Sequence, residues 1–138
     1  MGKNKKLSGL DRRYDAEDAK SIDVDVLEII SYEYKGKVVV IDIETSEFTA
    51  VCPYSGLPDF GHLKIHYTPR NYLIELRSLK YYLYSYRNVG MYQEHIVQRI
   101  LRDLVRLLHP KWIFIELDYN IRGGVHTVVR TEWGRKKK

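Results

Sequence analysis

The chain has 138 residues, of which 44% are hydrophobic and 30% are charged, a composition typical of one globular domain with a modest core. No apolar run approaches the roughly 20 residues that span a bilayer, and the N-terminus lacks the apolar stretch of a secretory signal. The single cysteine excludes an intrachain disulfide, so we expect a reducing, cytoplasmic location and no membrane partner.

The net charge of +5 arises at the two ends of the chain. Basic residues lie there in stretches that contain no acid: Lys3, Lys5, Lys6, Arg135, Lys136, Lys137 and Lys138. Without these seven of the 23 basic residues, 16 remain against 18 acidic residues, so the body of the chain is not basic. We expect solvated tails, with contact to nucleic acid as the alternative.

The first half of the body has the pattern of a β-hairpin followed by further strands. Residues 24–34 and 38–45 are rich in apolar and β-branched side chains, and Gly36 marks a turn between them. Residues 62–67 alternate between polar and apolar, which is typical of a strand with one buried face. Residues 72–76 predict another extended segment.

The second half predicts two helices and a closing hairpin. Ser78 is a candidate N-cap for the first helix. Apolar side chains recur every four residues along a second helix at 92–109, namely Ile96, Ile100, Leu104 and Leu108. Residues 112–119 and 125–133 predict two strands, with a turn at 122–124 between them.

This order of elements predicts an α+β fold in which two helices cover one face of an antiparallel sheet. We expect three parts along the chain. They are a flexible charged segment over residues 1–22, one domain over residues 23–133 and a basic tail over residues 134–138.

The segment around the cysteine is the strongest indication of chemistry. An apolar run delivers Cys52 to a loop rich in proline and glycine, and Asp59 follows seven residues later. A thiol becomes a nucleophile when its pKa is lowered or a base lies nearby, so Cys52 is a candidate nucleophile and Asp59 a candidate general acid or base. The alternatives are a small buried hydrophobic residue for Cys52 and a turn residue for Asp59.

Two further segments carry candidate binding residues. Arg77 and Lys80 lie at a predicted helix start, where backbone N–H groups suit a phosphate, although a solvated helix face explains the segment taken alone. Glu94 begins the longer helix, where it can bind the N–H edge of a purine-like ring or simply complement the helix dipole. We expect no metal site, because the lone cysteine has no close cluster of other ligands.

Together these residues resemble the QueF family of NADPH-dependent nitrile reductases, which act on 7-cyano-7-deazaguanine (preQ0). Residues 75–81 match the family's Glu–Lys motif, with Arg77 in place of a lysine. Residues 48–60 are similar to the family's nucleophile loop, and residues 85–88 and 122–124 match as well. The resemblance covers residues 46–131.

The resemblance implies a tunnelling fold (T-fold), whose subunits close into rings and stack as a decamer of two pentamers with active sites at subunit interfaces. It implies that Cys52 attacks the nitrile carbon to form a thioimide and that Asp59 protonates the nitrile nitrogen. Hydride from NADPH then leads to 7-aminomethyl-7-deazaguanine, in the biosynthesis of queuosine in tRNA.

The resemblance also implies binding roles. Glu94 would bind the pyrimidine edge of the base, while Glu75 and Ser78 would shape the pocket. The residues implied to hold NADPH phosphates are Arg77, Lys80 and Arg122. Many members have a histidine directly before the substrate-binding glutamate, whereas this chain has Gln93 there and His95 after it, so we expect His95 as a substrate-binding candidate.

Two alternatives remain at this stage. The archaeal QueF-like amidinotransferase forms the same thioimide on a base already in tRNA and resolves it with ammonia to archaeosine. Basic tails favour that enzyme, because they can contact RNA phosphates, whereas the nearly intact motif at residues 75–81 favours the reductase. The second alternative is a T-fold binding protein without catalysis.

Overall fold

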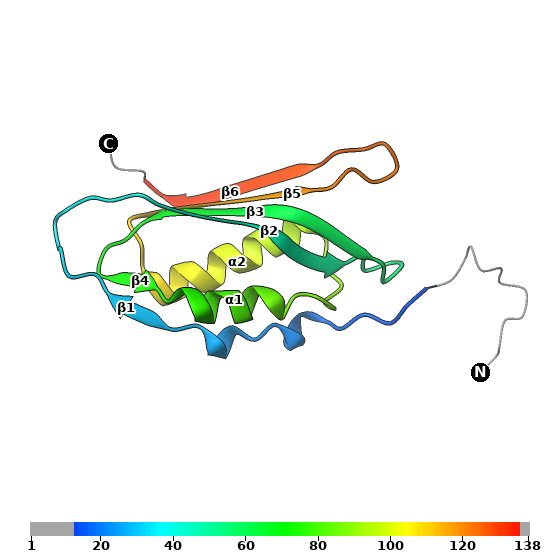
Figure 1. Ribbon diagram of the computed structural model, residues 1–138, viewed down its shortest axis with the longest axis horizontal. Coiled ribbons are helices and arrows are strands. Elements are labelled where there is room, and N and C mark those ends of the chain that lie inside the picture. Colours follow the sequence, from blue (N-terminus) through cyan, green and yellow to red (C-terminus); the bar gives the residue numbers. More distant parts are fainter. Residues whose placement is uncertain (1–12, 136–138) are drawn as a thin grey trace, which may run out of the picture.

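The computed structural model describes residues 13–135 (Figure 1). The elements are, in chain order, the short 3-10 turns η2 (Ala19–Ser21) and η3 (Val24–Val26), β1 (Ile29–Ser31), β2 (Ile41–Val51), β3 (Pro58–Thr68), β4 (Tyr72–Ile74), α1 (Leu76–Tyr84), α2 (Gln93–Leu108), β5 (Trp112–Tyr119) and β6 (Val128–Gly134). Within the described part of the chain, no helix combines the length and apolar character needed to cross a membrane.

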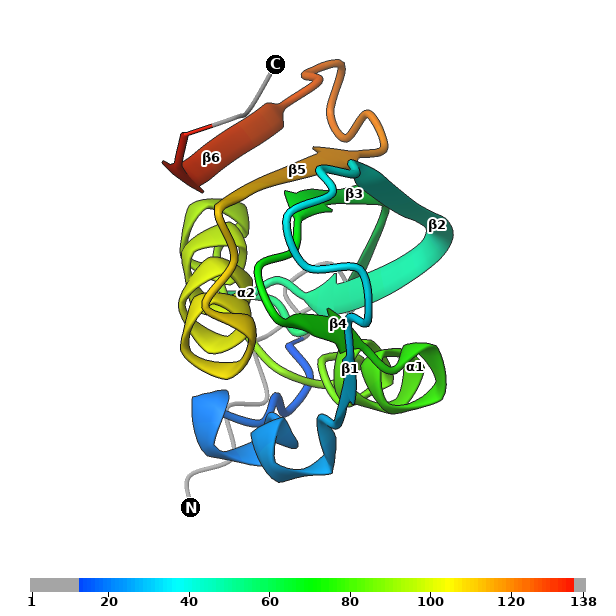
Figure 2. The same cartoon turned by 90° about the vertical axis from the view of Figure 1, so that its left-hand side faces the viewer.

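Four strands form an antiparallel sheet in the order β2–β3–β5–β6, while β1 and β4 form a separate antiparallel pair. Helices α1 and α2 lie on the same side of the larger sheet, with α2 under β5 and β6 and α1 towards β2 (Figures 1 and 2). The expected α+β arrangement, with an antiparallel sheet and two helices on one face, is confirmed.

The predicted first hairpin is wrong. Residues 24–26 form a 3-10 turn, and β1 pairs with β4 rather than with β2. The partner of β2 is β3, and both strands have 11 residues. A long strand gains more ladder hydrogen bonds from a partner of equal length than from the three residues of β1, and the loop that carries Cys52 connects the two long strands.

The expected flexible segment over residues 1–22 lies partly outside the described residues, which begin at residue 13. In its described part, Glu17 forms a parallel bridge with Val89, and Ile22 is buried in the core. The three parts proposed along the chain, including the flexibility of this segment and the tail from residue 134, stay predictions.

The core fills the space between the sheet and the two helices. The predicted stripe on α2 is confirmed, since each of its four members is at most 1% exposed: Ile96, Ile100, Leu104 and Leu108. On the sheet side the fully buried Ile113, Ile115 and Leu117 of β5 belong to the same cluster. Burial of each such side chain contributes about 1.5–3 kcal/mol, so the core fixes the sheet edge that carries the cysteine loop.

A buried hydrogen-bond network joins the two helices and gives a stability prediction. Asp103 of α2 is 5% exposed and accepts hydrogen bonds from the Tyr82 hydroxyl (2.7 Å) and from Arg99 Nε (2.7 Å). We expect Asp103→Ala to lower the free energy of unfolding by about 3–5 kcal/mol, because a buried hydroxyl and a partly buried guanidinium lose their acceptor. Urea unfolding measures it. Gln98→Ala, on the exposed face of α2, is the control, and equal losses in both variants would contradict the prediction.

Candidate active site

The cysteine loop is the connection of the β2–β3 hairpin. Val51 at the end of β2 pairs with Pro58 at the start of β3. Between them, the Cys52 N–H donates to the Leu57 carbonyl (2.9 Å), and the Gly56 N–H donates to the Cys52 carbonyl (2.8 Å). The thiol is therefore presented at a hairpin tip whose backbone is fixed on both sides of the cysteine.

The electrostatic surroundings of Cys52 favour a thiolate. Burial raises the pKa of the thiol, but this effect is outweighed by hydrogen bonds from the Ser55 N–H and hydroxyl, by the Tyr54 N–H and by the charge of Arg122. Together they hold the pKa below the ordinary value of a cysteine. A partly exposed thiol with a lowered pKa has the properties of a nucleophile rather than of a buried hydrophobic residue.

The lowered pKa predicts the pH dependence of labelling. We expect iodoacetamide to alkylate folded Cys52 with a midpoint below that of the unfolded chain, which is about 8.5, because the thiolate persists to lower pH. Intact mass against time and pH measures the rate, and the single cysteine makes the assignment unambiguous. The same protein in urea is the control. A folded midpoint equal to or above the unfolded one would contradict the prediction.

Asp59 and Arg122 meet beside this loop. Asp59 pairs in register with Ala50 of β2, and its side chain is 17% exposed. Its carboxylate forms an ion pair with the Arg122 guanidinium, and the same guanidinium lowers the pKa of Cys52. The structure thus brings Cys52, Asp59 and Arg122 into one neighbourhood.

Arg122 reaches this position from a tight turn between β5 and β6. Its N–H donates to the Val125 carbonyl (3.1 Å), and the Val125 N–H donates back (3.0 Å). The two central residues have positive φ, +59° at Gly123 and +78° at Gly124, as a two-residue hairpin turn requires. The predicted turn at residues 122–124 is confirmed.

Glu75 and Ser78 form hydrogen bonds with each other at the start of α1. The expectation that Ser78 caps this helix is wrong, because α1 begins at Leu76 and Glu75 is the N-cap. The Glu75 carboxylate accepts from the N–H groups of Ser78 (2.7 Å) and Arg77 (3.1 Å), which holds its pKa below the usual range. The buried Ser78 hydroxyl donates to the Glu75 carbonyl (2.8 Å) and accepts from the Glu28 N–H (3.0 Å). Their expected role in shaping a substrate pocket stays a prediction.

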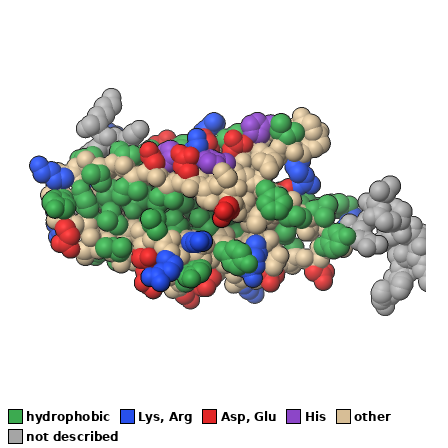
Figure 3. All heavy atoms as spheres, viewed as in Figure 1, with side chains coloured by type: hydrophobic (Ala, Val, Ile, Leu, Met, Phe, Trp, Pro, Cys, Tyr) green, Lys and Arg blue, Asp and Glu red, His purple; other side chains and the backbone are tan. Residues whose placement is uncertain are grey.

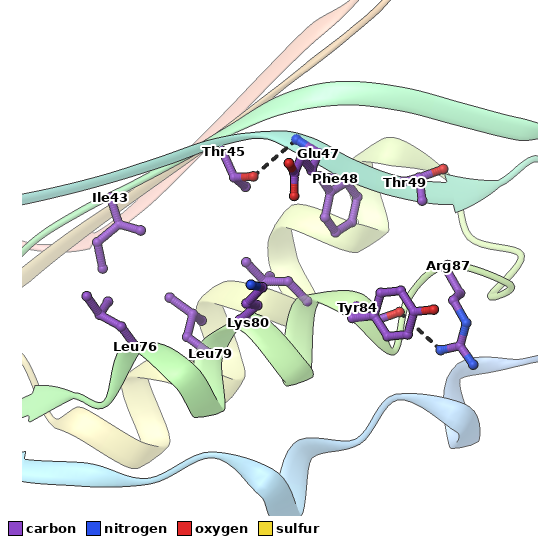
Figure 4. A pocket seen from close by; sticks show the side chains of 11 residues that line it. Ile43, Thr45, Glu47, Phe48, Thr49, Leu76, Leu79, Lys80, Tyr84 and Arg87 are labelled. Atoms are coloured by element: carbon purple, nitrogen blue, oxygen red, sulfur yellow. Dashed lines mark hydrogen bonds between the residues drawn. The ribbon is translucent and has the colours of Figure 1, made fainter.

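An open apolar groove of about 310 Å³ lies between β2 and α1 (Figure 4). Phe48 and Leu79 supply apolar walls, and Lys80 of α1 lines the groove with its charged side chain. Thr49 lines it too and connects it with the cysteine loop, because its hydroxyl donates to the Asp59 carbonyl (2.8 Å). Of the three expected phosphate-binding residues, Lys80 lies in this groove, Arg77 is exposed at the start of α1, and Arg122 is paired with Asp59.

Glu94 and His95 are exposed in the first turn of α2. The His95 ring lies edge-on to Tyr92, with 5.9 Å between ring centroids. The linker before this helix passes the cysteine loop, since the Val51 N–H donates to the Val89 carbonyl (3.1 Å). The first turn of α2 therefore begins a few residues from the hairpin that presents Cys52.

Gln93 is a residue to which sequence reasoning gave no role. Its side-chain nitrogen donates to the carbonyls of Leu117 (2.7 Å) and Thr127 (2.9 Å), so it ties the start of α2 to the end of β5 and to the β5–β6 connection. The sequence does carry a signal for it, because Gln93 lies three and seven residues before Ile96 and Ile100, on the buried face.

Cys52 is a free cysteine, so no disulfide lies within residues 13–135. No group of histidine, cysteine, aspartate or glutamate side chains in this range is arranged to hold a metal ion. The site consists of a hairpin-borne thiol, a paired carboxylate and guanidinium, and an apolar groove with a cationic rim, which defines a protein able to perform covalent chemistry through cysteine.

The chain belongs to the QueF family, since the family model described as "QueF-like protein" matches residues 58–138. A relative from Caldicellulosiruptor bescii, named NADPH-dependent 7-cyano-7-deazaguanine reductase, is 52% identical over 118 residues, which is 86% of this chain and 90% of the relative. A relative of the same name from Thermotoga maritima is 48% identical over 120 residues, 86% of each chain.

A solved structure supports the fold. The crystal structure of the archaeosine synthase QueF-Like in its apo form superimposes with a TM-score of 0.64 at 20% identity, covering 75% of this chain and 100% of that chain. At this identity the similarity concerns the fold alone. The family resemblance found in the sequence is confirmed.

Proposed function

We propose that this chain is an NADPH-dependent nitrile reductase that converts 7-cyano-7-deazaguanine to 7-aminomethyl-7-deazaguanine in queuosine biosynthesis. Relatives with that reductase name are about half identical to the chain over most of their length. The structural observation that carries the proposal is a partly exposed Cys52 of lowered pKa beside the Asp59–Arg122 pair.

In the proposed mechanism, the Cys52 thiolate attacks the nitrile carbon and forms a carbon–sulfur bond, while Asp59 gives a proton to the nitrile nitrogen. The product is a thioimide held on Cys52. NADPH, when bound, supplies two hydrides, one to the thioimide carbon and one to the imine that forms after Cys52 leaves. One further proton on the nitrogen completes the neutral amine, so each nitrile consumes two NADPH.

Residues of α1 and α2 would bind the substrate and the cofactor. Glu94 would accept hydrogen bonds from the N–H edge of the deazaguanine, with His95 beside it and with Glu75 and Ser78 bounding the pocket. Arg77 and Lys80 are cations that fit phosphate groups, and the exposure of both supports this assignment. Arg122 would leave or share its pairing with Asp59 when it contacts a phosphate.

We further propose that the chain has a T-fold and assembles into rings, with a decamer of two pentamers. Within the described chain, β2 and β6 are edge strands of the larger sheet, so a β6 edge can pair with the β2 edge of a neighbour around a ring. Exposed apolar side chains border the β2 side, including Leu76 and Tyr84, and Figure 3 shows hydrophobic side chains gathered on this face. Such an assembly would complete the groove between β2 and α1. Light scattering at micromolar concentration tests it.

Free 7-cyano-7-deazaguanine and NADPH test the proposed reaction directly. We expect loss of absorbance at the nicotinamide band, with two NADPH oxidised for each nitrile consumed. A covalent adduct visible by mass spectrometry without NADPH oxidation would refute the reductase. It would instead support the amidinotransferase, which would then be tested on tRNA that carries the cyano-deazaguanine base, with ammonia.

A further inference from the structure

Residues 13–17, here called the N-terminal strap, lie against the tip of the β2–β3 hairpin (Figure 1). The Tyr14 N–H donates to the Ser55 carbonyl (2.9 Å). The Arg13 guanidinium lies 4.0 Å above the Tyr54 ring centroid and also donates to the Tyr54 hydroxyl. Sequence reasoning assigned these residues to a flexible segment, so the contact with the cysteine loop was not foreseen.

The loop is shaped to receive the strap. Gly56 has φ +73°, and a Cβ at this position would lie 2.2 Å from the Tyr14 carbonyl oxygen and 2.8 Å from its carbon. A backbone atom cannot yield as a flexible side-chain end can, so this position accommodates the strap only as glycine. The close approach shows that the strap and the loop fit together at the level of the backbone.

The strap also holds the linker that leads into α2. The Glu17 N–H donates to the Asn88 carbonyl (2.7 Å), and the Gly90 N–H donates to the Glu17 carbonyl (2.8 Å). The same linker bonds on its other side to the end of β2, through Val51 and Val89 (3.1 Å). The linker is therefore fixed between the strap and the strand that delivers Cys52.

Ser55 connects the strap to the thiol. Its carbonyl accepts from Tyr14, while its N–H and hydroxyl donate to Cys52. The tip of the loop has little apolar anchoring of its own, since Tyr54 is 65% exposed. Within the loop, the Leu57 N–H donates to the Ser55 hydroxyl (3.2 Å), and the Tyr14 N–H adds a second restraint on Ser55 from outside the loop.

We propose that the N-terminal strap positions the active site, holding the cysteine loop in the conformation in which Ser55 and Tyr54 donate hydrogen bonds to Cys52. Arg13 and Tyr14 are positioning residues, because they act through the loop and not on a substrate. The strap contributes in this way to the reactivity of the thiol, whichever reaction follows.

Two substitutions of Tyr14 in the full chain distinguish the effect of its backbone hydrogen bond from the effect of its side chain. Tyr14→Pro removes the N–H that donates to Ser55, whereas the matched control Tyr14→Ala removes the same ring and keeps the N–H. We expect iodoacetamide labelling of Tyr14→Pro to have a midpoint about one pH unit higher, which lowers the rate near neutral pH by up to about tenfold. Tyr14→Ala should stay close to the unchanged protein.

A second variant covers the case in which Tyr14→Pro fails to fold by circular dichroism. Arg13 is exposed, and Arg13→Ala removes its stacking on Tyr54, so this variant should also raise the pH midpoint of labelling. Arg13→Lys lacks the planar guanidinium and should raise the midpoint as well. The proposal is overturned if folded Tyr14→Pro, or Arg13→Ala in its place, labels like the unchanged protein at every pH.

Labelling needs neither NADPH nor a nitrile, so its result is independent of the proposed reductase activity. The rate of adduct formation with 7-cyano-7-deazaguanine, which rests on the proposed function, should fall in Tyr14→Pro in proportion to labelling. A fall in melting temperature with an unchanged labelling profile would show that the strap only stabilises the fold and would overturn the proposal.

Discussion

Cys52→Ala should abolish both the oxidation of NADPH by 7-cyano-7-deazaguanine and the covalent adduct with this nitrile. The proposed reaction passes through a carbon–sulfur bond, and the chain contains no other thiol to form it. We expect turnover to fall by roughly four orders of magnitude or more, the scale seen when an enzyme loses its nucleophile. Stopped assays of NADPH absorbance and intact mass measure the two losses separately.

Cys52→Ser is the matched control for the shape of the loop. The hydroxyl has nearly the size of the thiol but is not ionised at neutral pH, so we expect no adduct from it either. Because the thiol is partly exposed, neither variant leaves a buried cavity, and both should melt within a few degrees of the unchanged protein. An adduct that persists in Cys52→Ala would show that another residue attacks the nitrile.

The fold could be predicted where local periodicity decides it. The buried stripe of α2 and the alternation along β3 follow from side-chain spacing, and the structure confirms these elements. Strand pairing could not be predicted in this way. Residues 24–34 and 38–45 are as apolar as two strands that do pair, so their composition suggested a hairpin that the structure does not contain. The pairing of β2 with β3 depends on equal strand length and on the cysteine loop that joins them, which composition does not reveal.

The candidate site could be predicted in part from one continuous segment. Cys52 and Asp59 belong to the same hairpin, so their closeness follows from the chain itself. Arg122 could not be placed in this way, because its charge suits a phosphate as well as a carboxylate and only the β5–β6 turn brings it to Asp59. Ser78 illustrates the reverse, since a residue type favoured at the N-cap is instead the third residue of α1 and is buried.

Contacts made by the backbone escaped sequence reasoning more completely than those made by side chains. The strap reaches the cysteine loop through the Tyr14 N–H and carbonyl, groups that every residue other than proline carries. A polar stretch such as residues 11–18 has the composition of a flexible segment. The backbone N–H groups of Tyr14 and Glu17 nevertheless donate hydrogen bonds to the carbonyls of Ser55 and Asn88. Composition measures the tendency to bury side chains, and this docking depends mainly on hydrogen bonds.

Asp59→Asn should separate proton delivery from activation of the thiol. An amide cannot give the nitrile nitrogen its proton, so we expect kcat/KM for NADPH oxidation to fall about 10²–10⁴-fold. The substitution leaves in place the groups that lower the pKa of Cys52, namely Ser55, Tyr54 and Arg122, so the iodoacetamide midpoint should not rise. Arg122→Ala should have the opposite signature, since loss of its positive charge raises the pKa of Cys52 and therefore the labelling midpoint.

Together, these two variants distinguish the role of Asp59 from that of Arg122. If Asp59→Asn raised the labelling midpoint as much as Arg122→Ala, Asp59 would act by holding Arg122 near the thiol rather than by donating a proton. If Asp59→Asn lost turnover while labelling and adduct mass stayed normal, Asp59 would serve only the steps after attack. The proposed role requires slow adduct formation with an unimpaired thiol, because protonation of the nitrogen accompanies carbon–sulfur bond formation.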